Sequence, residues 1–140
     1  MKPVPGRGGV DPALVVVLAG VSAALHVGKL PPALPVLQQA LGLSLVQSGF
    51  LLSLVQLGGM LFGLVAGLSG DSLGHRRCML LGLGTLATAS LLGGFAGNAT
   101  LLLTLRGLEG LGFLLAVTPA PSLVRRVVAP GDLDAKLGLW

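Results

Sequence analysis

Four ionisable side chains lie inside long apolar stretches of this sequence. His26 and Lys29 stand three residues apart in the first stretch, and Arg106 and Glu109 stand three apart in the last. Residues at this spacing share one face of a helix. Ionisable groups in apolar surroundings usually face an aqueous cavity or one another. We therefore expect these four residues to line a substrate cavity, with Gln56 as a further lining candidate.

Other kinds of chemistry lack the residues they need. The sequence has no Cys/His cluster with metal-ligand spacing, and its one cysteine, Cys78, cannot form a disulfide within the chain. It also has no nucleophile elbow and no phosphate-binding loop. We expect no enzyme activity, no metal and no cofactor. With one Trp and no Tyr, an aromatic stacking surface is missing, so no nucleic-acid partner is expected.

The composition indicates a membrane environment. Of the 140 residues, 53% are hydrophobic and 10% are charged, whereas a soluble domain carries about 25% charged residues. So few charges cannot cover a soluble surface, but a bilayer solvates the apolar face of a helix. We therefore expect an all-α membrane protein, with the lipid bilayer as a partner.

Four apolar stretches are each long enough to cross roughly 30 Å of hydrocarbon as a helix. The predicted helices are 12–40, with a bend at its prolines, 45–68, 78–96 and 100–124. Ser44 is expected to cap the second helix. Residues 137–140 indicate the start of a fifth helix, so we expect a truncated bundle. The domain division is a 1–11 segment, a 12–124 transmembrane region, and a 125–140 connection with that start.

The basic residues predict the orientation in the membrane. Outside the predicted helices they occur only before the first helix, between the second and third, and after the fourth: Lys2, Arg7, Arg76, Arg77, Arg125, Arg126 and Lys136. The positive-inside rule places these three segments in the cytoplasm. We expect a multi-pass protein of the cell (inner or plasma) membrane with a cytoplasmic N-terminus. A cleaved signal peptide over 1–25 is the alternative.

The charged residues then fall in the outer half of the membrane. At about 1.5 Å per residue, Lys29 lies roughly 25 Å from the inner start of its helix, and Arg106 roughly 10 Å from the outer start of its own. The hypothesis is an outward-facing cavity that attracts small anions. The alternatives are that Lys29 extends to the outer surface and that Arg106 only pairs with Glu109.

Glycines of the second helix suggest a packing surface. Gly59, Gly63 and Gly67 recur at every fourth residue and form a smooth stripe. Small residues at this spacing let another helix approach closely. We therefore expect this stripe to be a helix–helix contact, with a lipid-facing stripe as the alternative.

The segment between the second and third helices has a distinctive pattern of residues. Gly67, Asp71, Gly74, Arg76 and Arg77 form a G-x-x-x-D-x-x-G-x-R-R sequence. A carboxylate at the membrane edge needs a cation or a helix N-terminus as partner. The second glycine permits a turn with positive φ. We expect this loop to have a structural and gating role.

This pattern resembles the loop motif of major facilitator superfamily transporters. A second match, R-x-x-x-G from Arg106 to Gly110, lies in the fourth helix, as in that family. Ser72 and His75 depart from the motif, because the family usually has basic residues there. The resemblance implies that Asp71 helps to lock the cytoplasmic side against a helix of the C-terminal half. The stretch 34–49 is most similar to the cyanate- and nitrate-type branch.

The resemblance implies a function in transport. The chain would be the N-terminal part of a secondary transporter, with four of the six helices of one bundle. It would move a small anion or organic solute, driven by an ion gradient and in association with a coupling ion. Its protein partner would be the missing C-terminal half or another membrane chain. The alternative is a small oligomeric or partner-binding membrane protein without transport activity of its own.

Overall fold

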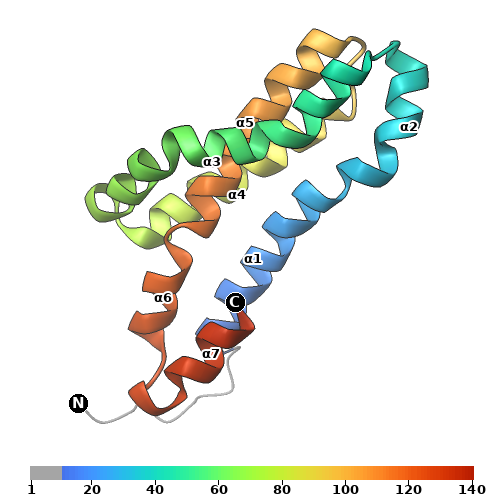
Figure 1. Ribbon diagram of the computed structural model, residues 1–140. Helices are drawn as coiled ribbons and strands as arrows, with labels where there is room; N and C mark the ends of the chain where they lie inside the picture. Colours follow the sequence, from blue (N-terminus) through green and yellow to red (C-terminus); the bar gives the residue numbers. More distant parts are fainter. Residues whose placement is uncertain (1–10) are drawn as a thin grey trace.

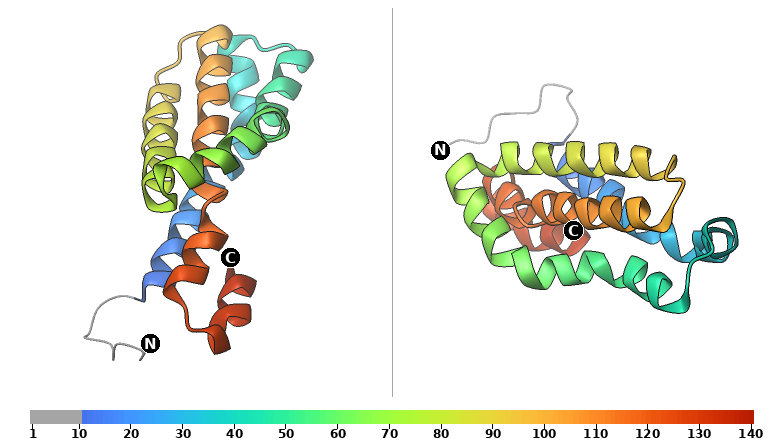
Figure 2. Two further views of the ribbon diagram at one scale, coloured as in Figure 1. Left: turned by 90° about the vertical axis from the view of Figure 1, so that its left-hand side faces the viewer. Right: turned by 90° about the horizontal axis from the view of Figure 1, so that it is seen from above.

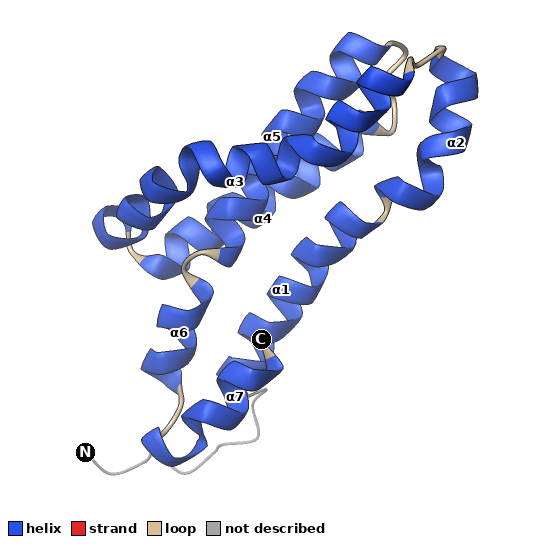
Figure 3. Ribbon diagram, in the orientation of Figure 1, coloured by secondary structure: helices blue, strands red, loops and turns tan. Residues whose placement is uncertain are grey.

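The computed structural model describes residues 11–140, with only the helical backbone for residues 59, 60, 62 and 64–73. The described part consists of helices joined by short loops, without strands (Figures 1 and 3). In chain order the helices are α1 (Pro12–Gly28), α2 (Leu30–Leu41), α3 (Leu45–Leu73), α4 (His75–Gly93), α5 (Ala99–Val117), α6 (Ala120–Val127), the 3-10 turn η1 (Pro130–Asp132) and α7 (Leu133–Leu139). The predicted all-α fold is confirmed.

Side-chain caps fix where several helices begin. The Ser44 hydroxyl accepts a hydrogen bond from the Gln47 backbone N–H, and the Gln47 side chain accepts one from the Ser44 N–H. This reciprocal capping box satisfies two backbone donors that the first turn leaves free, and it confirms the cap predicted at Ser44. Asn98 caps α5 with a single bond, because its side-chain oxygen accepts a hydrogen bond from the Leu101 N–H.

The first apolar stretch bends at its prolines, as predicted. Helix α1 ends at Gly28, Lys29 forms the junction, and α2 starts with Pro31 and Pro32 near its N-terminus. Proline has no backbone N–H, so the hydrogen-bond ladder of α1 cannot continue through this pair. The break therefore places Lys29 at the junction of two helices, which Figure 1 shows in blue and cyan.

Other predicted boundaries were wrong. Helix α3 continues through the predicted 67–77 loop to Leu73, and α4 begins at His75. Within this segment only Gly74 leaves the helical conformation. Its φ is +85°, a value that glycine adopts without steric cost. At the other end, the predicted 100–124 helix breaks between α5 and α6, where Pro119 cannot donate to the ladder. The predicted connection is also largely helical, and α7 begins at Leu133 rather than 137.

Two helical stretches of the described chain are long and apolar enough to cross a membrane. They are Pro12–Leu41 and Ala99–Val127, each with its break, and Leu45–Gly58 is a shorter apolar segment. The first and fourth predicted spans therefore meet this criterion of length and composition. The number of four spans stays a prediction.

Helix α5 lies between α3 and α4 (Figure 2). Its closest contact is with α4, where Gly82 and Gly112 face each other. A Cβ on Gly82 would lie 2.7 Å from the Gly112 carbonyl oxygen, and one on Gly112 would lie 2.8 Å from the Leu86 nitrogen. Both helices carry glycine at the crossing, so their backbones can touch.

Only Gly63 of the predicted glycine stripe on α3 has described surroundings, so the packing role of the stripe stays a prediction. A Cβ on Gly63 would meet no heavy atom within 4 Å. What surrounds Gly59 and Gly67 lies outside the described residues. At Gly82 and Gly112 both helices carry glycine, whereas a stripe of small residues on one helix does not show which helix faces it.

Valine at position 82 is expected to destabilise the fold. Gly82→Val would place a branched side chain against the backbone of α5, and such overpacking costs about 1–3 kcal/mol or more. Gly84→Val is the matched control, because a Cβ on Gly84 meets nothing within 4 Å and the change in helix propensity is the same. Thermal unfolding of the 140-residue chain in nanodiscs, followed by circular dichroism, compares the two. Equal midpoints for both variants would contradict the close contact.

Helices α6 and α7 fold back beside α1. Val16 of α1 is buried together with Met79, Ala120 and Val124, and the Trp140 ring lies directly over Gly20. The Lys136 ammonium lies 2.7 Å from the Asp11 carboxylate at the start of α1. The two ends of the described chain are therefore held together by an apolar cluster and one ion pair (Figure 1).

The ion pair predicts a pH-dependent contact. Hydrogen bonds from the Lys136 side chain and then from the Ala13 N–H hold the pKa of Asp11 below its ordinary 3.8. A lowered pKa means that the contact stabilises the fold above pH 3.8 and is lost as the pH falls through the folded-state pKa. Lys136→Gln should raise the pKa of Asp11, and Lys136→Arg should leave it low. A carbon-13 titration of the Asp11 carboxyl measures this, and an unchanged pKa in Lys136→Gln would exclude the contact.

Candidate functional site

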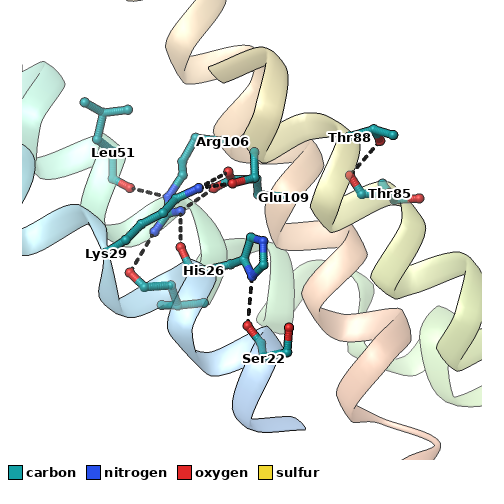
Figure 4. A network of polar contacts seen from close by, with 10 residues as sticks. Ser22, His26, Lys29, Leu51, Thr85, Thr88, Arg106 and Glu109 are labelled. Carbon is teal, nitrogen blue, oxygen red and sulfur yellow. Dashed lines mark hydrogen bonds and ion pairs between the residues drawn. The ribbon is translucent and has the colours of Figure 1, made fainter. Parts of the chain in front are cut away.

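Three of the predicted site residues meet in one cluster. The Lys29 ammonium lies 2.8 Å from one carboxylate oxygen of Glu109, and the Arg106 guanidinium donates to the other. Figure 4 shows these side chains pointing toward one another from the α1–α2 junction and from α5. One carboxylate is therefore shared by two cations that come from opposite ends of the sequence.

Arg106 is held by backbone carbonyls as well as by Glu109. Its Nε donates to the Leu51 oxygen at 3.2 Å, and its two terminal nitrogens donate to His26 at 3.2 Å and Val27 at 3.3 Å. The Val27 carbonyl would ordinarily accept from the residue four positions on, which is Pro31 and has no N–H. The helix break thus frees an acceptor, and Arg106 joins α5 to α1 and α3 through it (Figure 4).

Burial differs sharply between the two cations. Arg106 is 4% exposed and Glu109 is 6% exposed, whereas the side chain of Lys29 is 42% exposed. Every buried side-chain nitrogen and oxygen of the described residues has a hydrogen-bond partner. Buried charges are costly unless they are paired and fully hydrogen-bonded, and Arg106 and Glu109 meet both conditions.

A cavity of about 380 Å³ lies beside the cluster. Its polar lining is Lys29, Arg106, Glu109 and Ser90 of α4, whose hydroxyl accepts a hydrogen bond from the Lys29 ammonium. The remaining lining is apolar or glycine: Leu30, Ala33, Leu37, Leu51, Gly93, Gly94, Leu102 and Leu105. Small-molecule sites are typically apolar clefts with a few converging polar groups, and this cavity has that character.

The other predicted lining residues lie elsewhere. The His26 side chain turns back on α1, where its Nδ1 lies 2.8 Å from the Ser22 carbonyl, and only its own backbone carbonyl joins the cluster. Gln56 is exposed on α3 and does not line the cavity. Ser90 was not foreseen from the sequence. Its polar side chain inside an apolar helix was the available signal.

The structure places the loop-motif residues at the α3–α4 junction. Gly74 has the predicted positive φ, and Arg76 and Arg77 are exposed in the first turn of α4. The helical backbone includes Gly67 and Asp71, but their side-chain surroundings lie outside the described residues. The gating role of this motif stays a prediction.

Comparison with known proteins finds a matching family profile and a matching relative, but no matching solved structure. The family profile of the Major Facilitator Superfamily matches residues 13–140. A tetracenomycin C resistance and export protein of Streptomyces glaucescens is 34% identical over 141 residues, which cover 96% of this chain and 25% of that protein. No solved structure matches the chain.

These matches decide the family, but they do not support its predicted branch. The chain spans about a quarter of the length of the curated relative, and that relative is a resistance and export protein, so the cyanate- and nitrate-type branch finds no support. The family profile covers nearly the whole chain, including both motifs that carry the resemblance. The chain therefore belongs to the major facilitator superfamily, a family of membrane transporters.

Proposed function

We propose that this chain forms the N-terminal portion of an ion-gradient-driven exporter of an organic solute, and that the cavity beside Glu109 is part of the solute path. The observation that carries the proposal is the Lys29–Glu109–Arg106 cluster at the wall of an apolar cavity. Its support from similarity is the export function in the name of the Streptomyces glaucescens relative.

The position of the cluster favours a solute site over a purely structural one. Ionisable groups within membrane segments are rare, because each costs several kcal/mol, and they commonly mark solute or ion pathways. Lys29 also lies at a break between two helices, and broken helices are a recurrent feature of transporter binding sites. A structural ion pair would need neither the cavity nor the half-exposed lysine.

The proposal includes an orientation and a partner. The N-terminus, the 70–77 segment and the 125–136 segment would face the cytoplasm, and residues 12–124 would span the membrane. The remaining helices of a transporter would supply the other wall of the path and the partner of Asp71. An ion gradient would drive transport between two states that open on opposite sides.

A chimera tests this function. The segment of the Streptomyces glaucescens protein that aligns with this chain is replaced by this chain, and efflux of tetracenomycin C from loaded cells is measured. We expect efflux that stops when the ion gradients across the membrane are dissipated. The parent protein serves as the control, at membrane amounts matched by immunoblot. A chimera that inserts normally but exports nothing would contradict the proposal and favour the alternative, an oligomeric or partner-binding membrane protein.

A further inference from the structure

We infer that the cavity takes an amphipathic solute with an apolar body and one anionic oxygen, and that Lys29 is the counter-ion of that oxygen. This inference rests on the proposed function, because it names the chemical class of the solute for the same cavity. Three observations support it: the net charge of the cluster, the difference in exposure between its two cations, and the apolar lining of the cavity.

The described residues of the cavity lining do not balance one another in charge. They include two cations, Lys29 and Arg106, and one carboxylate, Glu109, so one positive charge is left over among them. An uncompensated charge in a low-dielectric setting attracts a counter-ion more strongly than the same charge in water. The cavity therefore favours an anion over a neutral molecule or a cation.

Only one of the two cations is available to a solute. Arg106 is 4% exposed and already donates to Glu109 and three carbonyls. The Lys29 ammonium has three donors, and among the described residues two of them are used, by Ser90 and Glu109. The Lys29 side chain is also 42% exposed. The third N–H is therefore the group that an anionic oxygen would meet.

The rest of the cavity decides what surrounds that oxygen. Most of its lining is apolar, with leucines on α2, α3 and α5, and its volume is about 380 Å³. Organic ligands occupy pockets of about 300–1,000 Å³ whose walls are mainly apolar. A small inorganic anion would leave these leucines in contact with water, whereas an amphipathic organic anion would cover them. The expected solute is therefore an organic anion rather than a small inorganic one.

A matched pair of ligands tests the inference. The 140-residue chain in nanodiscs of phosphatidylcholine is titrated with 2-naphthoate and with its neutral isostere 2-naphthamide, and binding is measured by calorimetry. We expect naphthoate to bind about tenfold more tightly than naphthamide, because one charge-assisted hydrogen bond distinguishes them. Lys29→Gln should abolish the difference, and Lys29→Arg should keep most of it. Lys136→Gln, which removes a cation far from the cavity, should change nothing.

Several results would overturn the inference. The inference is wrong if the two ligands bind equally, or if the preference for naphthoate persists in Lys29→Gln. It is also wrong if naphthoate does not bind to the folded chain. Repeating the titration with phosphatidylglycerol in the nanodisc distinguishes a solute from a lipid headgroup as the source of the anion. Unchanged naphthoate affinity supports a solute, and its loss assigns the site to lipid. Efflux by the chimera decides the proposed function separately, since a chimera that exports tetracenomycin C would support that function even if naphthoate and naphthamide bound equally well.

Discussion

Replacing Arg106 by glutamine is expected to cost about 3–5 kcal/mol of folding free energy, the usual result of breaking a buried ion pair. The substitution leaves Glu109 without its buried partner and removes the donors to the carbonyls of His26, Val27 and Leu51. These bonds join α5 to α1 and α3, so their loss affects the packing of three helices. Thermal unfolding of the chain in nanodiscs measures the effect.

Two further variants make the Arg106 experiment specific. Arg125→Gln removes an exposed arginine on α6 and should change stability little. Arg106→Lys keeps the charge but cannot reach acceptors in several directions, because an ammonium lacks the planar fork of a guanidinium. It should therefore be clearly less stable than the natural chain. If Arg106→Gln were as stable as Arg125→Gln, the carbonyl contacts would not stabilise the fold.

Glutamine at position 109 is expected to have the second largest effect. Glu109→Gln leaves Arg106 buried without a counter-charge, at a cost of about 3 kcal/mol or more, and should stop efflux by the chimera. Adding Lys29→Gln returns the net charge of the cluster to its natural value. Because Lys29 and Glu109 are in contact, the effects of the two substitutions on the free energy of unfolding should not add. The expected interaction energy is about 1–2 kcal/mol.

The double-mutant cycle on Lys29 and Glu109 gives this prediction its control. The combined variant should be more stable than the sum of the two single effects implies. Replacing Lys136 together with Glu109 removes a cation that lies in a different contact, with Asp11, and those two effects should add. Additive effects for Lys29 and Glu109 as well would show that the ion pair contributes no stability.

Much of the cluster could be predicted from the sequence. Arg106 and Glu109 are one helical turn apart, so their pairing follows from local geometry. The depth estimate placed Lys29 and Arg106 in the same half of the membrane, and in the structure both bind the same carboxylate. This prediction was possible because a charge in an apolar environment is stable only when it pairs with another charge or faces a polar cavity.

Other features depended on contacts that no local pattern contains. Ser90 joins the cluster through a hydrogen bond from Lys29, a residue 61 positions earlier in the chain. The His26 ring bonds within its own helix, although it shares a face with Lys29. Helix ends were also difficult, because Asp71 and Ser72 resemble loop residues but remain helical until Gly74. Periodicity indicates a face of a helix, but tertiary packing selects its partner.

The central claim is that the cavity beside Glu109 is on the solute path, and solute protection of a cysteine tests it most directly. All native cysteines of the chimera are first removed, Cys78 by Cys78→Ala. The substitution Ala33→Cys then places one cysteine in the cavity wall. Ala40→Cys is the control, because Ala40 is exposed on the same helix and does not line the cavity. The rate of maleimide labelling is then measured with and without tetracenomycin C. We expect the solute to slow labelling of Ala33→Cys severalfold and to leave Ala40→Cys unchanged, whereas equal rates with and without the solute at both positions would contradict a solute path through this cavity.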